Sequence, residues 1–130
     1  MPFNANLEVD NKQFRIINCN YEMKRETDEF GKPTTPTRGG KITITIESST
    51  EPIFAIWMTS EKMRKAGKIV FEDPLEDADY KTVEFTDAYM VKYKEEFGSD
   101  AVDSGMIETF TISAKELKIG DAKKENKWPK

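Results

Sequence analysis

The sequence contains no histidine. Histidine supplies the base of Ser-His-Asp triads, the usual proton shuttle near neutral pH and most zinc ligands. Those kinds of site are therefore excluded from this chain. Catalysis would have to rest on carboxylates, and no spacing singles out a pair among the 24 acidic residues. We expect no catalytic residues and predict that the chain is not an enzyme.

Cysteine is nearly absent as well, because Cys19 is the single one in the chain. A lone cysteine forms no disulfide within its own chain, which favours a cytoplasmic origin. Cys19 alternates with Tyr21 and Met23 in a strand-like run. We interpret it as a small buried hydrophobe and not as a nucleophile.

Long apolar runs are also missing: no stretch of 18 apolar residues is present, so no helix is expected to span a membrane. The start, Met1-Pro2-Phe3-Asn4, lacks the basic and apolar regions of a signal peptide, so none is expected. The net charge of −4 argues against binding to nucleic acid, which depends on lysine and arginine meeting phosphates.

Two segments resemble ligand motifs only in part. Gly39-Gly40-Lys41 looks like the end of a phosphate-binding loop, but Ile42 stands where that motif has serine or threonine. The acidic residues between Glu72 and Asp79 lack the regular spacing and central glycine of a calcium loop. The sequence therefore predicts no cofactor and no metal.

Alternation of apolar and polar residues is the dominant pattern. Ile42, Ile44 and Ile46, for example, alternate with polar residues, which is typical of a strand with one buried face. Glu84 and Glu108 are expected on the polar faces of their strands. The predicted strands cover residues 3–9, 14–25, 41–47, 68–72, 81–86, 88–94, 106–113 and 116–119.

The alternation of apolar and polar residues gives way once to a helical spacing of apolar residues, between residues 51 and 66. Hydroxyl residues and Pro52 favour a helix start, and Gly67 favours its end. The expected apolar face contains Ile53, Ile56, Trp57 and Met63, with Phe54 and Met58 beside them. The 130 residues thus predict a single mainly β domain over 1–130, an antiparallel β-barrel of about six to eight strands with one flanking α-helix.

Two segments do not fit a minimal barrel. Residues 26–40 contain prolines and glycines without periodicity, and loops of that length in small domains are usually functional or disordered. The tail over 120–130 is basic and carries Trp128. We expect this tryptophan to dock either on its own barrel or on a neighbouring subunit.

Several short segments match a known pattern in order along the chain: Phe3-x-Ala5-x-Leu7, Cys19-x-Tyr21-x-x-Lys24-Arg25, FTDAYMVKY at 85–93, TFTISA at 109–114, Ile119-Gly120, Glu125-Asn126 and Trp128-Pro129. With these segments the chain resembles, over essentially its whole length, the type VI secretion tube proteins known as Hcp or TssD.

The resemblance implies a subunit of a homohexameric ring. Rings of this family stack into a tube that a contractile sheath propels and that can carry effector proteins in its lumen. The implied partners are other copies of the chain and the sheath, baseplate and spike components. The implied location is the bacterial cytoplasm, followed by export through the apparatus without a signal peptide.

In this family the long loop extends onto neighbouring subunits, and residues 26–40 match its position. Heterologous ring and stacking contacts of about 800 Å² each would take nearly half of the roughly 7,000 Å² that a monomer of this size exposes. The inter-subunit candidates are Phe30, Lys32, Pro33, Pro36, Arg38, Phe97 and Trp128.

Two alternatives remain open at this stage. The chain could be a monomeric β-barrel that binds a small ligand, with Phe85, Tyr89 and Phe110 lining a pocket. It could also be the tube protein of a related phage-tail-like injection device.

Overall fold

The structure, a computed structural model, describes residues 4–35, 39–73, 75, 78–100, 102–120 and 122–126. The described chain is mainly β with one short helix. In chain order its elements are β1 (Asn4–Val9), β2 (Lys12–Tyr21), β3 (Lys41–Glu47), α1 (Ile53–Thr59), β4 (Lys65–Asp73), β5 (Ala78–Phe97), β6 (Met106–Ser113), β7 (Glu116–Ile119) and β8 (Ala122–Glu125).

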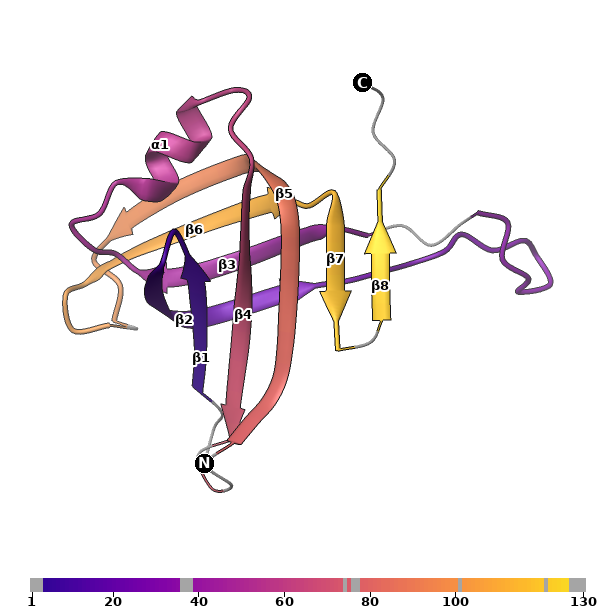
Figure 1. The fold of residues 1–130 in the computed structure, drawn as a ribbon, viewed down its shortest axis with the longest axis horizontal. Coiled ribbons are helices and arrows are strands. Elements are labelled where there is room, and N and C mark those ends of the chain that lie inside the picture. The colour runs from indigo at the N-terminus through magenta and orange to yellow at the C-terminus, as the bar shows by residue number, and fades with distance from the viewer. Residues whose placement is uncertain are drawn as a thin grey trace.

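The strands form an antiparallel barrel in the order β4-β1-β2-β3-β6-β5, closed by a pairing between β4 and β5 (Figure 1). Strands β7 and β8 extend this sheet from β5. Closure provides neighbours for strand edges that would otherwise be free to pair with other chains. The predicted fold class, an antiparallel barrel with one helix, is confirmed.

Strand β5 is longer than the sequence pattern indicated. The segments predicted over 81–86 and 88–94 are one continuous strand of 20 residues. Its first half pairs with β4 and its second half with β6. The change of partner coincides with Asp87, whose φ of 50° breaks the alternation at that point.

The predicted helix over 51–66 is wrong in its extent, because α1 ends at Thr59. Residues 60–64 form a turn, and β4 begins at Lys65, which pairs with Ala88, while the ring of Phe85 lies against Gly67. Gly67 is therefore a strand residue and not a helix end. Sheet pairing overrides the helical periodicity here.

The predicted apolar face of the helix is correct only in part. Phe54 and Trp57 are buried, whereas Ile56 and Met58 are 49% and 39% exposed. The indole nitrogen of Trp57 donates hydrogen bonds of 3.2 Å to the backbone carbonyls of Met63 and Ala88. Trp57 thus fixes α1 and the segment after it to β5.

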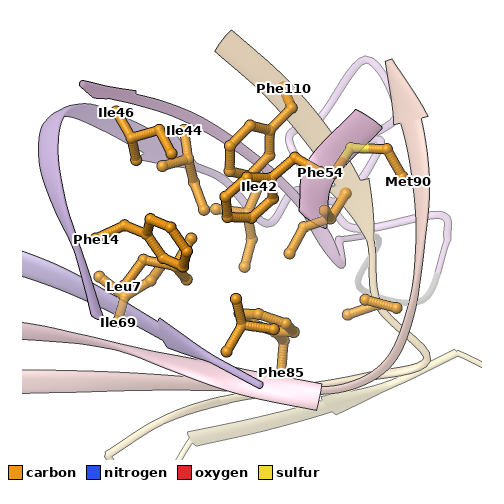
Figure 2. Close-up of a cluster of buried hydrophobic side chains, with 14 of the residues drawn as sticks. Leu7, Phe14, Ile42, Ile44, Ile46, Phe54, Ile69, Phe85, Met90 and Phe110 are labelled. Atoms are coloured by element: carbon orange, nitrogen blue, oxygen red, sulfur yellow. The ribbon is translucent and has the colours of Figure 1, made fainter. Parts of the chain in front are cut away.

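The barrel interior is filled by alternate side chains of the strands and by α1 (Figure 2). Phe54 enters from the helix, with its ring centroid 4.4 Å from that of Phe110 and 4.9 Å from that of Phe14. Phe85 and Phe110 are 2% and 1% exposed, so both belong to the core. Tyr89 is half-buried, and the guanidinium of Arg64 lies 5.9 Å from its ring centroid.

Strand bounds differ from the prediction at a few further places. Strand β2 ends at Tyr21 instead of continuing to residue 25, and a bulge between Ile16 and Asn18 shifts its phase. Strand β8, in the segment predicted as a tail, was not anticipated. In the described part of the chain, no helix is long and apolar enough to cross a membrane.

Candidate functional site

The feature that a barrel does not need is the segment between β2 and β3, residues 22–40, which we call the excursion. Figure 1 shows it running away from the barrel beyond the ends of both strands. Strands β2 and β3 remain paired up to Tyr21 and Ile42, so a tight turn could join them there. The excursion is therefore not required to connect the strands.

A network around Asp28 organises the tip of the excursion. The Asp28 carboxylate accepts hydrogen bonds of 2.9 Å and 3.0 Å from the backbone N–H groups of Phe30 and Lys32. The Asp28 N–H donates to the Lys32 carbonyl at 2.9 Å, and Gly31 turns the chain with a φ of 85°. The tip is a small preorganised hairpin.

Further hydrogen bonds hold the two arms of the hairpin together. Thr27 pairs with Pro33, and the Thr34 N–H donates to the Glu26 carbonyl at 2.8 Å. The hydroxyl of Thr35 accepts a 3.0 Å hydrogen bond from the Glu26 N–H. Ordering this hairpin costs backbone entropy, yet every residue from 22 to 34 is exposed. It buries almost nothing in its own subunit.

Three predicted interface residues lie together on this hairpin. Phe30 at its tip is 87% exposed, and Lys32 and Pro33 follow it on the exposed returning arm. Pro36 and Arg38, predicted for the same surface, lie outside the described residues, as does Trp128 in the tail. An ordered tip that presents a phenyl ring to solvent is typical of a contact with another molecule.

Phe97 lies elsewhere. It is the last residue of β5 and is 82% exposed, next to the turn in which the Gly98 N–H donates to the Gly105 carbonyl at 2.7 Å. Figure 1 shows the end of β5 on the far side of the barrel from the excursion. One subunit therefore presents exposed phenyl rings at two opposite ends, and the structure does not bring these candidates together.

The base of the excursion is fixed by a residue that sequence reasoning missed. The side-chain amide of Asn126, directly after β8, donates to the carbonyls of Gly39 and Ala114 at 3.0 Å and 2.9 Å. Gly40 has a φ of 105°, and a side chain there would meet the Asn126 amide and the Ala114 carbonyl. The expected role of Gly39 and Gly40, turning the chain back into its strand, fits this geometry.

The accessible surface is large for the mass of the chain. It measures 8823 Å², whereas a compact monomer of 14.9 kDa exposes about 7,000 Å². Exposed apolar side chains contribute to the excess, among them Phe30 and Phe97. A surface of this extent and composition suits a subunit of an assembly.

Hollows on the outer surface of the described barrel include one beside the β1–β2 turn and one over β3, β5 and β6. The larger, of about 610 Å³, lies over the β1–β2 turn and the facing parts of β4 and β5, with charged side chains such as Glu8, Lys68 and Glu84 in its lining. The smaller, of about 210 Å³, lies on the outer face of β3, β5 and β6. There the hydroxyls of Thr43 and Thr111 are 3.0 Å apart. Neither hollow is lined mainly by apolar side chains, unlike a typical small-molecule site.

The burial of Cys19, Glu84 and Glu108 tests what the sequence predicted for these three side chains. Burial raises the pKa of the Cys19 thiol from 9.0 to about 11. The side chain packs against the core as expected of a small hydrophobe, but it is half-buried and not fully buried. Glu84 is exposed on its strand as predicted. The prediction for Glu108 is wrong: it shares the inner face of β6 with Phe110 and Ile112 and is only 3% exposed.

Comparison with known proteins identifies the family to which the chain belongs. The family model described as "Hemolysin coregulated protein Hcp (TssD)" matches residues 1–129. The chain belongs to the Hcp (TssD) family. This family supplies the tube protein of type VI secretion, and its members are structural proteins secreted by that system. The family predicted from the sequence is thus confirmed.

Solved Hcp structures share the fold over nearly the whole chain. Hcp1 from Flavobacterium johnsoniae is 39% identical, with a TM-score of 0.88 over 95% of this chain and 100% of that one. Hcp1 from Salmonella typhimurium is 13% identical, with a TM-score of 0.73 over 92% and 86% of the two chains. A type VI secretion system effector from Yersinia pestis is 10% identical, with a TM-score of 0.70 over 93% and 98%.

The last two likenesses establish only the shared fold, because their identity is low. No curated protein matches the sequence closely enough to count as a relative.

Proposed function

We propose that this chain forms homohexameric rings that stack into the inner tube of a type VI secretion apparatus. In this proposal a contractile sheath propels the tube, and effector proteins can travel in its lumen. The observation that carries the proposal is the hairpin of the excursion, residues 22–34, which is ordered and exposed, buries almost nothing in its own subunit and offers Phe30 at its tip. Membership of the Hcp family supports it.

The arrangement of exposed rings suits a repeating assembly. A ring or stack is built from heterologous contacts, in which one surface of a subunit meets a different surface of the next. The excursion, which carries Phe30, and the end of β5, which carries Phe97, lie on different sides of the subunit, as such contacts require (Figure 1). We propose that Phe30, Lys32, Pro33, Pro36, Arg38, Phe97 and Trp128 take part in these contacts.

The remaining partners follow from the same role. We propose that the tube meets sheath, baseplate and spike components, and that the protein resides in the bacterial cytoplasm before it leaves through the apparatus. Tube proteins of phage-tail-like injection devices form the second candidate class, since they would need the same self-association. The monomeric ligand barrel is less well supported, because Phe85 and Phe110 pack in the core.

Oligomeric state and imaging test the proposal directly. The full-length protein should behave as about six subunits in light scattering and should appear as rings in negative-stain images. A variant with residues 26–37 replaced by a short glycine–serine linker should keep the barrel and lose assembly, because the linker preserves Gly39, Gly40 and their contacts with Asn126.

A matched pair of point variants sharpens this test. Phe30→Ala should weaken assembly, whereas Leu75→Ala, which also removes a mostly exposed apolar side chain, serves as the control outside the candidate surface. A full-length protein that stays monomeric at high concentration would contradict the proposal. If the linker variant still forms rings, the excursion plays no part in ring assembly.

A further inference from the structure

The inner face of β6 carries a carboxyl group where the alternation calls for an apolar side chain. Glu108, Phe110 and Ile112 point the same way, and Glu108 is 3% exposed. One carboxyl oxygen, Oε1, accepts a hydrogen bond of 2.6 Å from the Tyr93 hydroxyl. The other, Oε2, is buried and has no hydrogen-bond partner among the residues that the structure describes.

The groups around this carboxyl come from two neighbouring elements. Strand β5 contributes Tyr93 and Glu95, and Glu95 is the residue directly opposite Glu108 in the β5–β6 register. The segment after β3 contributes Ser48, whose hydroxyl donates a 2.5 Å hydrogen bond to the Glu95 carboxylate. None of the ion pairs found among the described residues involves Glu108 or Glu95.

An ionised Glu108 would be costly in this environment. A carboxylate removed from water loses several kcal/mol of solvation unless a cation or several donors compensate it. Here the Tyr93 hydroxyl is its hydrogen-bond donor, and the residue directly opposite it on β5, Glu95, carries another carboxylate that repels it. A proton on Oε2 removes the buried charge and ends the repulsion between Glu108 and Glu95.

We propose that Glu108 is a buried proton-binding site in the barrel wall and that loss of its proton loosens the paired ends of β5 and β6. These ends lie beside the turn that follows Phe97, since Phe97 pairs with Met106 two positions beyond the Glu95–Glu108 pair. The site is separate from the proposed assembly role, because it belongs to the interior of one subunit.

The direction of the pH effect follows from the electrostatics. Burial raises the pKa of Glu108 above its usual 4.5, and repulsion from Glu95 raises it further, whereas the hydrogen bond from Tyr93 and the nearby Ser48 hydroxyl act in the opposite sense. A carboxyl whose pKa is raised by folding stabilises the protein fully below its unfolded pKa. That stabilisation is lost as the pH rises through the folded pKa.

The test is the pH dependence of unfolding in urea for the wild type and Glu108→Gln, compared at the same oligomeric state. Glutamine keeps an acceptor for Tyr93 and does not titrate. Above pH 4.5, the wild-type unfolding constant relative to the variant should rise by about tenfold per pH unit until the folded pKa is passed. Glu84→Gln, at an exposed position, should run parallel to the wild type.

A direct measurement keeps the proposal falsifiable if Glu108→Gln fails to fold. The ¹³C shift of the Glu108 carboxyl in the wild type should titrate above the usual glutamate range, and Glu95→Gln should move that titration to lower pH. Titration of Glu108 at its ordinary pKa would overturn the proposal. Parallel pH dependences of stability in the wild type and Glu108→Gln would also overturn it. The same holds if calcium stabilises the wild type at neutral pH but not Glu108→Gln, because Glu108 would then bind a metal ion and not a proton.

Discussion

The side-chain amide of Asn126 donates a 3.0 Å hydrogen bond to the backbone carbonyl of Gly39, 87 residues earlier in the chain. A second hydrogen bond from the same nitrogen reaches Ala114 at 2.9 Å. The Asn126 N–H also donates to the Lys115 carbonyl at 2.6 Å. The end of the β7–β8 hairpin therefore anchors the point where the excursion rejoins the barrel.

Asn126→Ala should destabilise the protein by about 1–3 kcal/mol, because two part-buried carbonyls lose their donor. Urea unfolding monitored by tryptophan fluorescence measures this loss. The control is Asn20→Ala, at an exposed asparagine of β2, which should change stability by less than about 0.5 kcal/mol. Equal effects at the two positions would show that the Asn126 contacts contribute nothing.

Gly40→Ala should cost more stability than Gly120→Ala. Both glycines have a positive φ, of 105° and 56°, so both substitutions place a side chain in an unfavourable backbone conformation. Only at Gly40 does the added methyl group also meet Asn126 and the Ala114 carbonyl, whereas at Gly120 it enters open space. Thermal unfolding of the two variants isolates this crowding. A smaller loss at Gly40 would contradict the packing described for this corner.

Trp57→Ala should lower the free energy of unfolding by about 3–5 kcal/mol, because a fully buried indole is replaced by a cavity. Two backbone carbonyls also lose the indole donor. The matched control is the preceding residue of the same helix: Ile56→Ala, at a half-exposed side chain, should cost less than about 1 kcal/mol. Chemical denaturation compares them, and a small effect at Trp57 would place the helix outside the core.

Cys19 should react slowly with iodoacetamide in the folded protein. With a pKa of about 11, about one thiol in 10,000 is ionised at pH 7, and the thiolate is the reactive form. The labelling rate should rise about tenfold per pH unit up to that pKa. It should also increase sharply in urea, where the thiol regains its ordinary pKa and full access. Rapid labelling of the native protein at pH 7 would contradict the burial of this residue.

Much of the barrel could be predicted from the sequence because alternation reports burial directly. Ile42, Ile44 and Ile46 have no measurable exposure, as their spacing indicated. The same logic applied strictly would have placed Glu108 inside, since it keeps the phase of Phe110 and Ile112. Its position in the alternation, and not its charge, decides its burial.

Other features depend on contacts between distant residues and leave little local signal. The apolar spacing of 53–63 fits a helix, but the pairing of Lys65 with Ala88 decides where the strand after α1 begins. The excursion was visible as a break in periodicity, whereas its anchor at Asn126 was not. Nothing near Asn126 in the sequence indicates a partner as remote as Gly39.

The shortness of α1 constrains the order in which the protein can fold. A helix of seven residues is too short to persist by itself in water, since isolated helices below about 12 residues are marginal. It has no side-chain cap, and neither end carries a charge that favours the helix dipole. We therefore expect the docked phenyl and indole rings to hold its helical conformation, so that the helix forms after the strands have enclosed a cavity for Phe54 and melts together with them.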